Sequence, residues 1–330
     1  MIQEIPQWKL IEKPLLPLQN SAIDVLPVLI LFGLLGLALW GAVRARRPDL
    51  VRWITRTVSL LVFVVFLHRC LCAIRGYLFG LRFVARDDLM AFNMLCVILP
   101  LIACGLIAGR LFCGWVCPLG FLQDLGRRLG ERLGFGNWLG WRGTPATTHL
   151  RMRSVTLASA LLLLIICLAT VTRPAGVVIA QSSAAIWGIG LCGLLVVHAT
   201  GLVSDGGLKR FRYGSLAIWT GLGVMGMFLT NPWCAMVGGE LDYSSVVGFI
   251  AVVLASWLVP LAWCRYLCPL GALLSLLARR ALVAIRGGEP ITAGGVSCGM
   301  EAWRNGGPDR TSCQLCRECG GRATSEEQEP

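Results

Sequence analysis

The chain has 330 residues, of which 56% are hydrophobic and only 15% are charged. Globular domains outside membranes usually carry about 25% charged residues, so the composition argues against an ordinary soluble enzyme and for a membrane protein. The formal net charge of +12 would suit a nucleic-acid-binding protein, but in a membrane protein the position of the basic residues matters more than their sum.

Long apolar stretches predict membrane-spanning helices in chain order. A helix that crosses the hydrocarbon core needs about 20 apolar residues, and the second of these stretches is interrupted by Arg56. The expected fold is an all-α, polytopic transmembrane helical bundle. Its spans, about seven in number, are 22–43, 53–67, 89–109, 154–172, 176–203, 214–230 and 244–263.

The basic residues are unevenly placed between these predicted spans. Most of them fall in the segments that would share one side of the membrane with the C-terminus. This bias is the positive-inside rule, so it disfavours nucleic acid as a partner and predicts a multi-pass protein in contact with membrane lipid. The cysteine motifs and the C-terminus would then face the cytoplasm.

Two segments between or after the spans have the pattern of helices that lie on a membrane surface. Residues 121–133 and 272–285 each place apolar residues at helical spacing with arginines between them. Beyond about Gly287 the composition changes to glycine, polar residues and cysteine. We therefore divide the chain into a transmembrane domain, 1–286, and a cysteine-rich tail, 287–330, whose end TSEEQEP is expected to be disordered.

The chain contains an internal repeat. The segment RLFCGWVCPLGFLQDL at 110–125 matches AWCRYLCPLGALLSL at 262–276. Each copy follows a predicted span and precedes a predicted surface helix. Two halves with the motif on the same side would meet about a pseudo-two-fold axis along the membrane normal.

Each copy of the repeat carries two cysteines at a CxxxC spacing, followed by Pro-Leu-Gly. On helical backbone this spacing puts both sulfurs on one face, one turn apart. The proline suits the first turn of the next helix, whose positive end would stabilise a negatively charged cluster. The pattern predicts a metal or iron–sulfur site made by Cys113, Cys117, Cys264 and Cys268.

The tail carries a second group of cysteines. C-x2-C-x2-C is the core of the bacterial ferredoxin ligand run, which usually ends in x3-C-P, but here no fourth cysteine follows. Cys298 would supply the fourth ligand from upstream, and zinc is the alternative because four thiolates also suit that metal. The tail ligands are thus Cys298, Cys313, Cys316 and Cys319.

Two groupings of these eight cysteines are compatible with the sequence. In one, the two CxxxC motifs jointly hold a 4Fe-4S cluster and the tail holds a second. In the other, each CxxxC pair combines with tail cysteines. Spacing alone does not choose between them.

At these motifs the chain resembles the NapH/NosR-type family of polytopic membrane ferredoxins. The matching residues are FCGWVCPLG (112–120), CRYLCPLGAL (264–273) and CQLCREC (313–319). The resemblance implies one or two 4Fe-4S clusters, a place in the bacterial inner membrane, and quinol oxidation or electron relay to a partner. The tail departs from the family, which commonly has complete C-x2-C-x2-C-x3-C-P runs.

The expected function is the electron-transfer, quinol-oxidising subunit of an oxidoreductase, relaying electrons between the quinol pool and a partner redox protein. Glu240 and Asp242 in a turn between spans are candidates for a quinone site, although solvated loop acids are the simpler interpretation. One alternative is an assembly or maturation factor that uses its clusters to reduce a metal or a cysteine in another enzyme. A cluster-free scaffold stapled by zinc is the other. The catalytic residues are unknown at this stage.

Overall fold

The computed structural model describes part of the chain. The described residues are 26–66, 89–132, 189–197, 205–224, 243–286, 300, 303–304, 307–317 and 322–325. Their longer helices are α1 (Leu26–Val43), α2 (Pro48–Leu60), α4 (Leu89–Ala108), α6 (Pro118–Arg132), α11 (Phe211–Val224) and α13 (Tyr243–Leu258). The shorter ones are the π-helix Leu61–Phe66, α5 (Leu111–Trp115), α10 (Asp205–Leu208), α14 (Ala262–Tyr266), α15 (Pro269–Leu277) and the 3-10 helix Ala278–Arg280.

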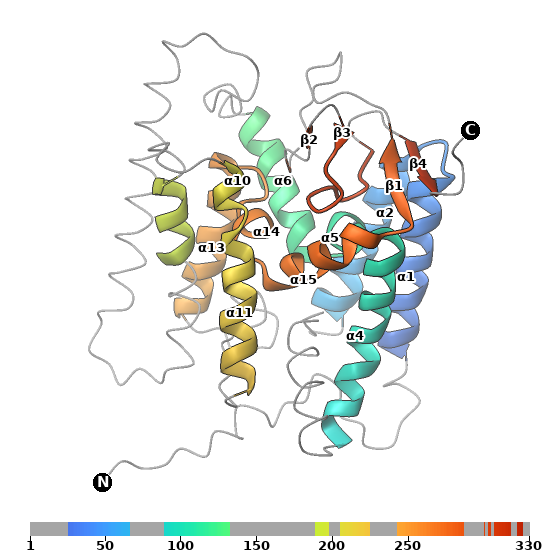
Figure 1. Cartoon of the computed structure of the whole chain (residues 1–330), viewed down its shortest axis with the longest axis horizontal. Helices are drawn as coiled ribbons and strands as arrows, with labels where there is room; N and C mark the ends of the chain where they lie inside the picture. Colours follow the sequence, from blue (N-terminus) through green and yellow to red (C-terminus); the bar gives the residue numbers. More distant parts are fainter. Residues whose placement is uncertain are drawn as a thin grey trace.

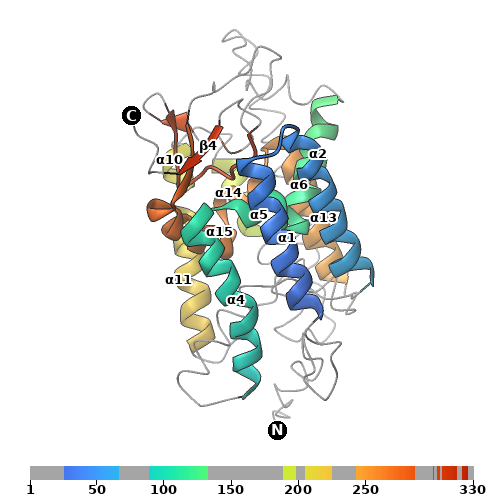
Figure 2. The ribbon, with the colours of Figure 1, turned by 90° about the vertical axis from the view of Figure 1, so that its right-hand side faces the viewer.

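The long helices surround a centre made of short ones. Figures 1 and 2 show α1, α4 and α11 running in the same general direction, with α5, α14 and α15 between them in the middle of the molecule. The two halves of the repeat pack against each other, because α6 of the first half lies against α13 of the second and α15 of the second lies against α4 of the first. The motifs of both halves are thereby brought to the same place.

The contact between α6 and α13 depends on small residues. Gly126 and Gly130 lie one turn apart on α6, and a Cβ atom at either would approach Trp257 of α13 at 3.3 Å. Without side chains at these two positions, the helix backbones come close and the large indole fills the space between them. This packing fixes the place of α6, which follows the first cysteine motif.

Four short strands form two antiparallel pairs near the C-terminal end. β1 (Val283–Arg286) pairs with β4 (Arg322–Ser325), and β2 (Trp303–Arg304) pairs with β3 (Gly307–Pro308). The predicted surface helix 272–285 is therefore wrong in its second half, since α15 ends at Leu277 and the chain turns into β1. The tail end predicted to be disordered begins in β4. In both cases a distant strand completes the backbone hydrogen bonds, which local periodicity does not reveal.

The prediction of a polytopic transmembrane bundle is contradicted. Among the residues that the structure describes, no helix combines the length and the apolar character needed to cross a membrane. Helices do form in the predicted apolar stretches, but α2, α11 and α13 have 13, 14 and 16 residues, fewer than the roughly 20 that a crossing requires. The same finding contradicts the predicted multi-pass localisation in the inner membrane.

Other parts of the fold prediction lie outside the described residues. They include the stretch 154–172 and most of 176–203, of which only 189–197 is described and is helical. The division at residue 286 stays a prediction, although β1 on one side of it pairs with β4 on the other.

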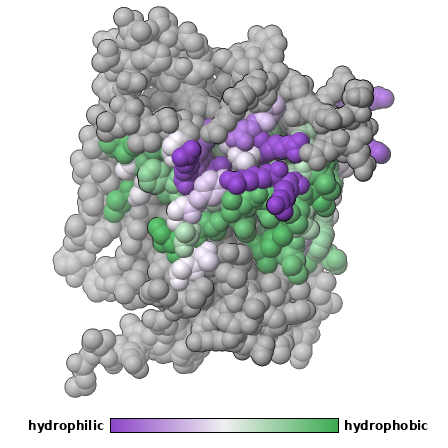
Figure 3. Space-filling model, viewed as in Figure 1, coloured by the Kyte–Doolittle hydropathy of each residue, from purple (hydrophilic) through white to green (hydrophobic). Residues whose placement is uncertain are grey.

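Apolar side chains of the described helices also lie on the outside. On α1, Leu29, Phe32 and Trp40 are each more than half exposed. Figure 3 shows hydrophobic surface below a band of hydrophilic residues on one face of the molecule. The hydrophobic residues thus form both an outer surface and the central core around the two motifs.

Candidate metal centre

Each cysteine motif is a short helix, a break and a second helix. In the first copy the Cys117 amide donates to the carbonyl of Phe112 at 2.9 Å, and in the second the Cys268 amide donates to the carbonyl of Trp263 at 2.8 Å. These bonds span five residues instead of the four of an α-helix, and they end α5 and α14. The proline that follows each second cysteine then begins α6 or α15, as the sequence predicted.

The second cysteine of each motif accepts a backbone hydrogen bond from the start of the next helix. The amide of Gly120 donates to Cys117 Sγ at 3.5 Å, and the amide of Gly271 donates to Cys268 Sγ at 3.3 Å. Both helix beginnings therefore direct a positive backbone group at a sulfur, which favours the thiolate form. The predicted effect of the helix N-terminus is thus present in the structure as a specific hydrogen bond.

The glycine of Pro-Leu-Gly is a functional residue that the sequence reasoning missed. A Cβ atom at Gly120 would lie 2.6 Å from the Cys113 carbonyl oxygen, and one at Gly271 would lie 2.9 Å from Arg110 Nη2. A side chain at Gly120 would displace the Cys113 backbone, and one at Gly271 would displace the Arg110 guanidinium. The repetition of this glycine in both motifs was the signal that could have found it.

The structure brings the four motif cysteines together. Cys113 and Cys264 are almost fully buried, and Cys117 and Cys268 are partly exposed. Burial is the largest cause that raises the pKa of the Cys264 thiol well above its usual value, and the neighbouring Cys268, Cys117 and Cys113 raise it further. Cys117 and Cys268 each have a pKa raised to about 12, by burial first and by Cys113 second. Thiols from both halves therefore lie within one another's electrostatic reach.

Buried guanidinium groups lower the pKa values of some of these thiols. Burial raises the pKa of Cys113, while Arg110 and then Arg212 draw it back down. Arg110 is 0% exposed and Arg212 is 2% exposed. Arg56 has the same lowering effect on the pKa of Cys117. A set of thiolates binding a metal cluster would thus find positive charge already in place.

A second buried network holds the backbone of the first motif. The Gly114 carbonyl accepts hydrogen bonds from Arg52 Nε at 3.1 Å and from Arg56 Nε at 2.7 Å. Both arginines also reach Asp124 on α6, which pairs in addition with Arg127 at 2.8 Å. Asp124 is 1% exposed, and through Arg52 and Arg56 this carboxylate connects α6 and α2 to Gly114 in α5.

Cys313 and Cys316 of the tail lie in a tight loop that contacts the first motif. The Leu315 amide donates to Cys313 Sγ at 3.4 Å, while Leu315 and Arg317 have φ angles of 54° and 60°. Non-glycine residues adopt this left-handed conformation at a cost, and they keep it only where the surrounding structure holds them in place. The other two predicted tail ligands, Cys298 and Cys319, lie outside the described residues.

The tail loop packs on the backbone between Cys113 and Cys117. The Trp115 indole donates to the Leu315 carbonyl at 3.1 Å, and a Cβ atom at Gly114 would lie 2.5 Å from the Gln314 carbonyl oxygen. The second copy of the repeat has Arg265 where the first has Gly114. The tail therefore packs against the one copy whose motif leaves room for it.

Replacing Gly114 by alanine should loosen the tail loop. The added Cβ atom overlaps Gln314, and overpacking of this kind costs about 1–3 kcal/mol. We expect a lower Tm and faster hydrogen exchange in residues 311–317. Gly214→Ala is the matched control, because a Cβ atom there meets nothing within 4 Å. Unchanged exchange in the Gly114→Ala variant would contradict the packing described above.

No three histidine, cysteine, aspartate or glutamate side chains within the described segments lie close enough together to ligate one metal ion. The cysteine sulfurs that bind a 4Fe-4S cluster lie farther apart than those that bind one ion, because each binds a different iron atom.

Comparison with known proteins identifies the chemistry of these motifs. Residues 89–136 and 241–287, which contain the two CxxxCP motifs, match the profile of a 4Fe-4S binding domain. Each half of the repeat is similar to that domain. The predictions of an iron–sulfur protein and of 4Fe-4S clusters are thus confirmed in this general form, whereas nothing in the match distinguishes the NapH/NosR type or supports a quinone or zinc.

One curated relative covers most of the chain. An uncharacterized protein of Methanocaldococcus jannaschii is 24% identical over 276 residues, which are 82% of this chain and 90% of that protein. No solved structure matches the chain. The similarity to the relative therefore extends well beyond the two cysteine motifs, but it brings no assigned activity.

Proposed function

We propose that this chain is an iron–sulfur electron-transfer protein in which Cys113, Cys117, Cys264 and Cys268 jointly hold one 4Fe-4S cluster. The observation that carries the proposal is the contact between the two motifs, since Arg110 and Gln123 on either side of the first motif donate hydrogen bonds to Cys264 of the second. The mutual effects of the four thiols on their pKa values agree with it. Of the two groupings compatible with the sequence, the structure favours this shared site. When bound, the cluster supplies a one-electron redox couple.

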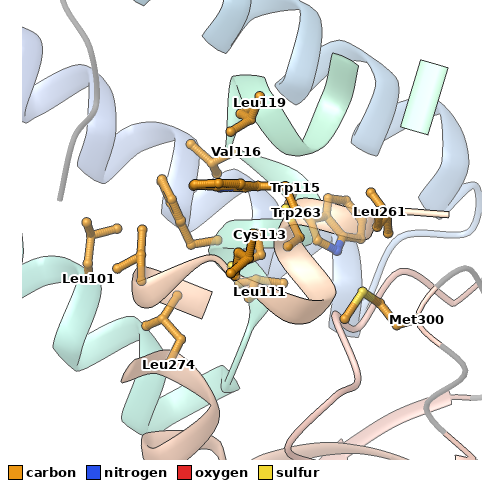
Figure 4. Close-up of a cluster of buried hydrophobic side chains, with 14 of the residues drawn as sticks. Leu101, Leu111, Cys113, Trp115, Val116, Leu119, Leu261, Trp263, Leu274 and Met300 are labelled. Atoms are coloured by element: carbon orange, nitrogen blue, oxygen red, sulfur yellow. The ribbon is translucent and has the colours of Figure 1, made fainter. Parts of the chain in front are cut away.

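The surrounding residues fit a thiolate-bound cluster. Two backbone amides donate to the sulfurs of Cys117 and Cys268, and hydrogen bonds to cluster sulfurs are among the features that set a reduction potential. Arg110 and Arg212 place buried positive charge beside the same thiols. Trp115 and Trp263, both 0% exposed, help to keep water from the site (Figure 4).

We propose further that the tail holds a second cluster on Cys298, Cys313, Cys316 and Cys319. The described part of the loop supports this, because the Leu315 amide points at Cys313 Sγ as amides do at cluster ligands. Metal analysis of the anaerobically purified protein separates the alternatives. Iron and sulfide lost on Cys313→Ser support a tail cluster, whereas zinc lost on that substitution would show a zinc site.

Exposed arginines surround the tail loop and form a surface suited to an acidic redox partner. Arg317 Nη1 donates to the Ala45 carbonyl at 3.2 Å, which places the loop beside the exposed turn that contains Arg46 and Arg47. On another side, Ala278 and Cys313 line one small cavity together with Arg310. The exposed Arg279 and Arg280 directly follow Ala278.

We propose that a redox protein with an acidic face docks on this arginine-rich surface and exchanges electrons there. Opposite charges steer two proteins together, and salt weakens the attraction. Electron transfer to flavodoxin, an acidic probe, should slow as the ionic strength rises and should slow further in Arg46→Glu. Equal rates with flavodoxin and with basic cytochrome c at every ionic strength would refute this surface as the docking site.

Quinol is the electron donor that we propose, on the resemblance of the motifs alone. Its candidate residues Glu240 and Asp242 lie outside the described part of the chain. Anaerobic mixing with a short-chain quinol, followed by EPR, tests the donor. Reduced-cluster signals would support quinol, and their absence in a protein that dithionite does reduce would exclude it.

A further inference from the structure

Two side chains of the first half of the repeat bind the second motif at Cys264. Arg110 Nη2 donates to the Cys264 carbonyl at 2.9 Å. From α6, Gln123 Nε2 donates to Cys264 Sγ at 3.2 Å, while its Oε1 accepts a hydrogen bond from the Trp263 amide at 3.2 Å. Both side chains are 0% exposed. Cys264 is thus held at its sulfur and at its carbonyl by the other half of the molecule.

The second half does not return these contacts. In the register that aligns Cys113 with Cys264, Arg110 corresponds to Leu261 and Gln123 corresponds to Leu274. A leucine side chain carries no donor, so neither Leu261 nor Leu274 can supply a side-chain hydrogen bond to Cys113. The two motifs have the same backbone path, but their thiols have different surroundings.

Arg110 has charge that no carboxylate in the described segments neutralises. Its Nε and Nη1 atoms are buried and have no hydrogen-bond partner there. A buried cation is costly unless an anion or a set of acceptors balances it. The anionic groups near Arg110 would be the thiolates of Cys113, Cys264 and Cys268, on whose pKa values it acts.

We propose that Arg110 and Gln123 are positioning residues that raise the reduction potential of the shared cluster, Arg110 as a buried cation beside both motifs and Gln123 through its hydrogen bond to Cys264. The proposal rests on the function proposed above. Reduction adds one electron and one negative charge to the cluster. The fixed cation of Arg110 and the N–H of Gln123 stabilise that charge without a proton having to be bound. Because Gln123 donates to Cys264 Sγ and its counterpart Leu274 has no donor for Cys113, the two motifs contribute unequally.

Leucine substitutions test this, because they install the residue that the other half of the repeat carries. We expect Gln123→Leu to keep its iron and to shift the midpoint potential, measured by EPR-monitored redox titration, to a more negative value. Arg110→Leu should shift it further in the same direction. Arg132→Leu, on the exposed end of α6, is the matched control and should leave the potential unchanged.

Arg110→Lys accompanies these variants because removal of a buried cation can prevent cluster insertion. A potential near that of wild type in Arg110→Lys, together with the negative shift in Gln123→Leu, supports the proposal even if Arg110→Leu loses iron. Full iron content with an unchanged potential in Gln123→Leu overturns it and leaves the shared cluster intact. Wild-type protein that binds no iron would instead refute the proposed function.

Discussion

Replacing either Cys113 or Cys264 by serine should remove the same iron, and replacing both should remove no more. A cubane has four thiolate ligands and about four iron atoms, so each single loss at a shared site damages the same cluster. We expect Cys113→Ser, Cys264→Ser and the double variant to lose equal amounts of iron and sulfide. Iron analysis and EPR after dithionite reduction measure this.

The double variant separates the shared site from the alternative grouping. If each CxxxC pair instead bound its own cluster with tail cysteines, the two single losses would add in the double variant, as independent sites do. Additive loss would therefore refute the shared site. Cys192→Ala is the matched control, because this cysteine is also fully buried and lies in neither motif, and it should keep its full iron content.

Replacing Asp124 by asparagine should strongly destabilise the protein. Asp124 is the carboxylate that binds Arg52, Arg56 and Arg127, all of them nearly fully buried. Breaking a buried ion pair by removing one partner costs about 3–5 kcal/mol, because the remaining charge stays buried without compensation. The measurement is the Tm of the anaerobic protein, with iron content as a second readout.

The position of Arg128 provides the control for Asp124. Its side chain is 37% exposed and lies 3.5 Å from the same carboxylate, and exposed ion pairs contribute only about 0–1 kcal/mol. Arg128→Gln should therefore change the Tm little. A Tm loss in Asp124→Asn no larger than that in Arg128→Gln would show that the buried network does not stabilise the fold.

The same carboxylate predicts how stability depends on pH. Burial acts to raise the pKa of Asp124, but Arg127, Arg52 and Arg56 outweigh it and hold the pKa below its ordinary value. A lowered pKa in the folded state contributes stability above the unfolded-state value of about 4. That contribution is lost as the pH falls below 4 toward the folded-state pKa. Asp124→Asn should lack this part of the pH dependence.

The amino-acid sequence by itself determined the chemistry of the centre. CxxxCP is a local pattern, and the helix, break and helix that it predicts form from backbone bonds within about ten residues of each cysteine. The repeat also identified the two motifs as equivalent segments. Both halves match a 4Fe-4S binding domain, in agreement with the iron–sulfur site that the cysteine pattern predicted.

Hydropathy was a poorer guide to the fold. The apolar stretches coincide with α1, α4 and α13, but they predicted complete membrane spans. None of the described helices has the length and apolar character that a span requires. Hydropathy also extended α15 through residues that form β1. An apolar stretch records only that its residues avoid water, and the elements packed against it decide where the helix ends.

Only the tertiary structure decided which residues from distant parts of the chain meet at the cysteines. Arg110 and Gln123 contact Cys264 across more than 130 residues of sequence. Asp124 forms ion pairs with arginines of α2 and α6. The tail loop rests on Gly114 because a glycine leaves room there for Gln314. Such contacts depend on how whole helices pack, so no spacing within the sequence contains them.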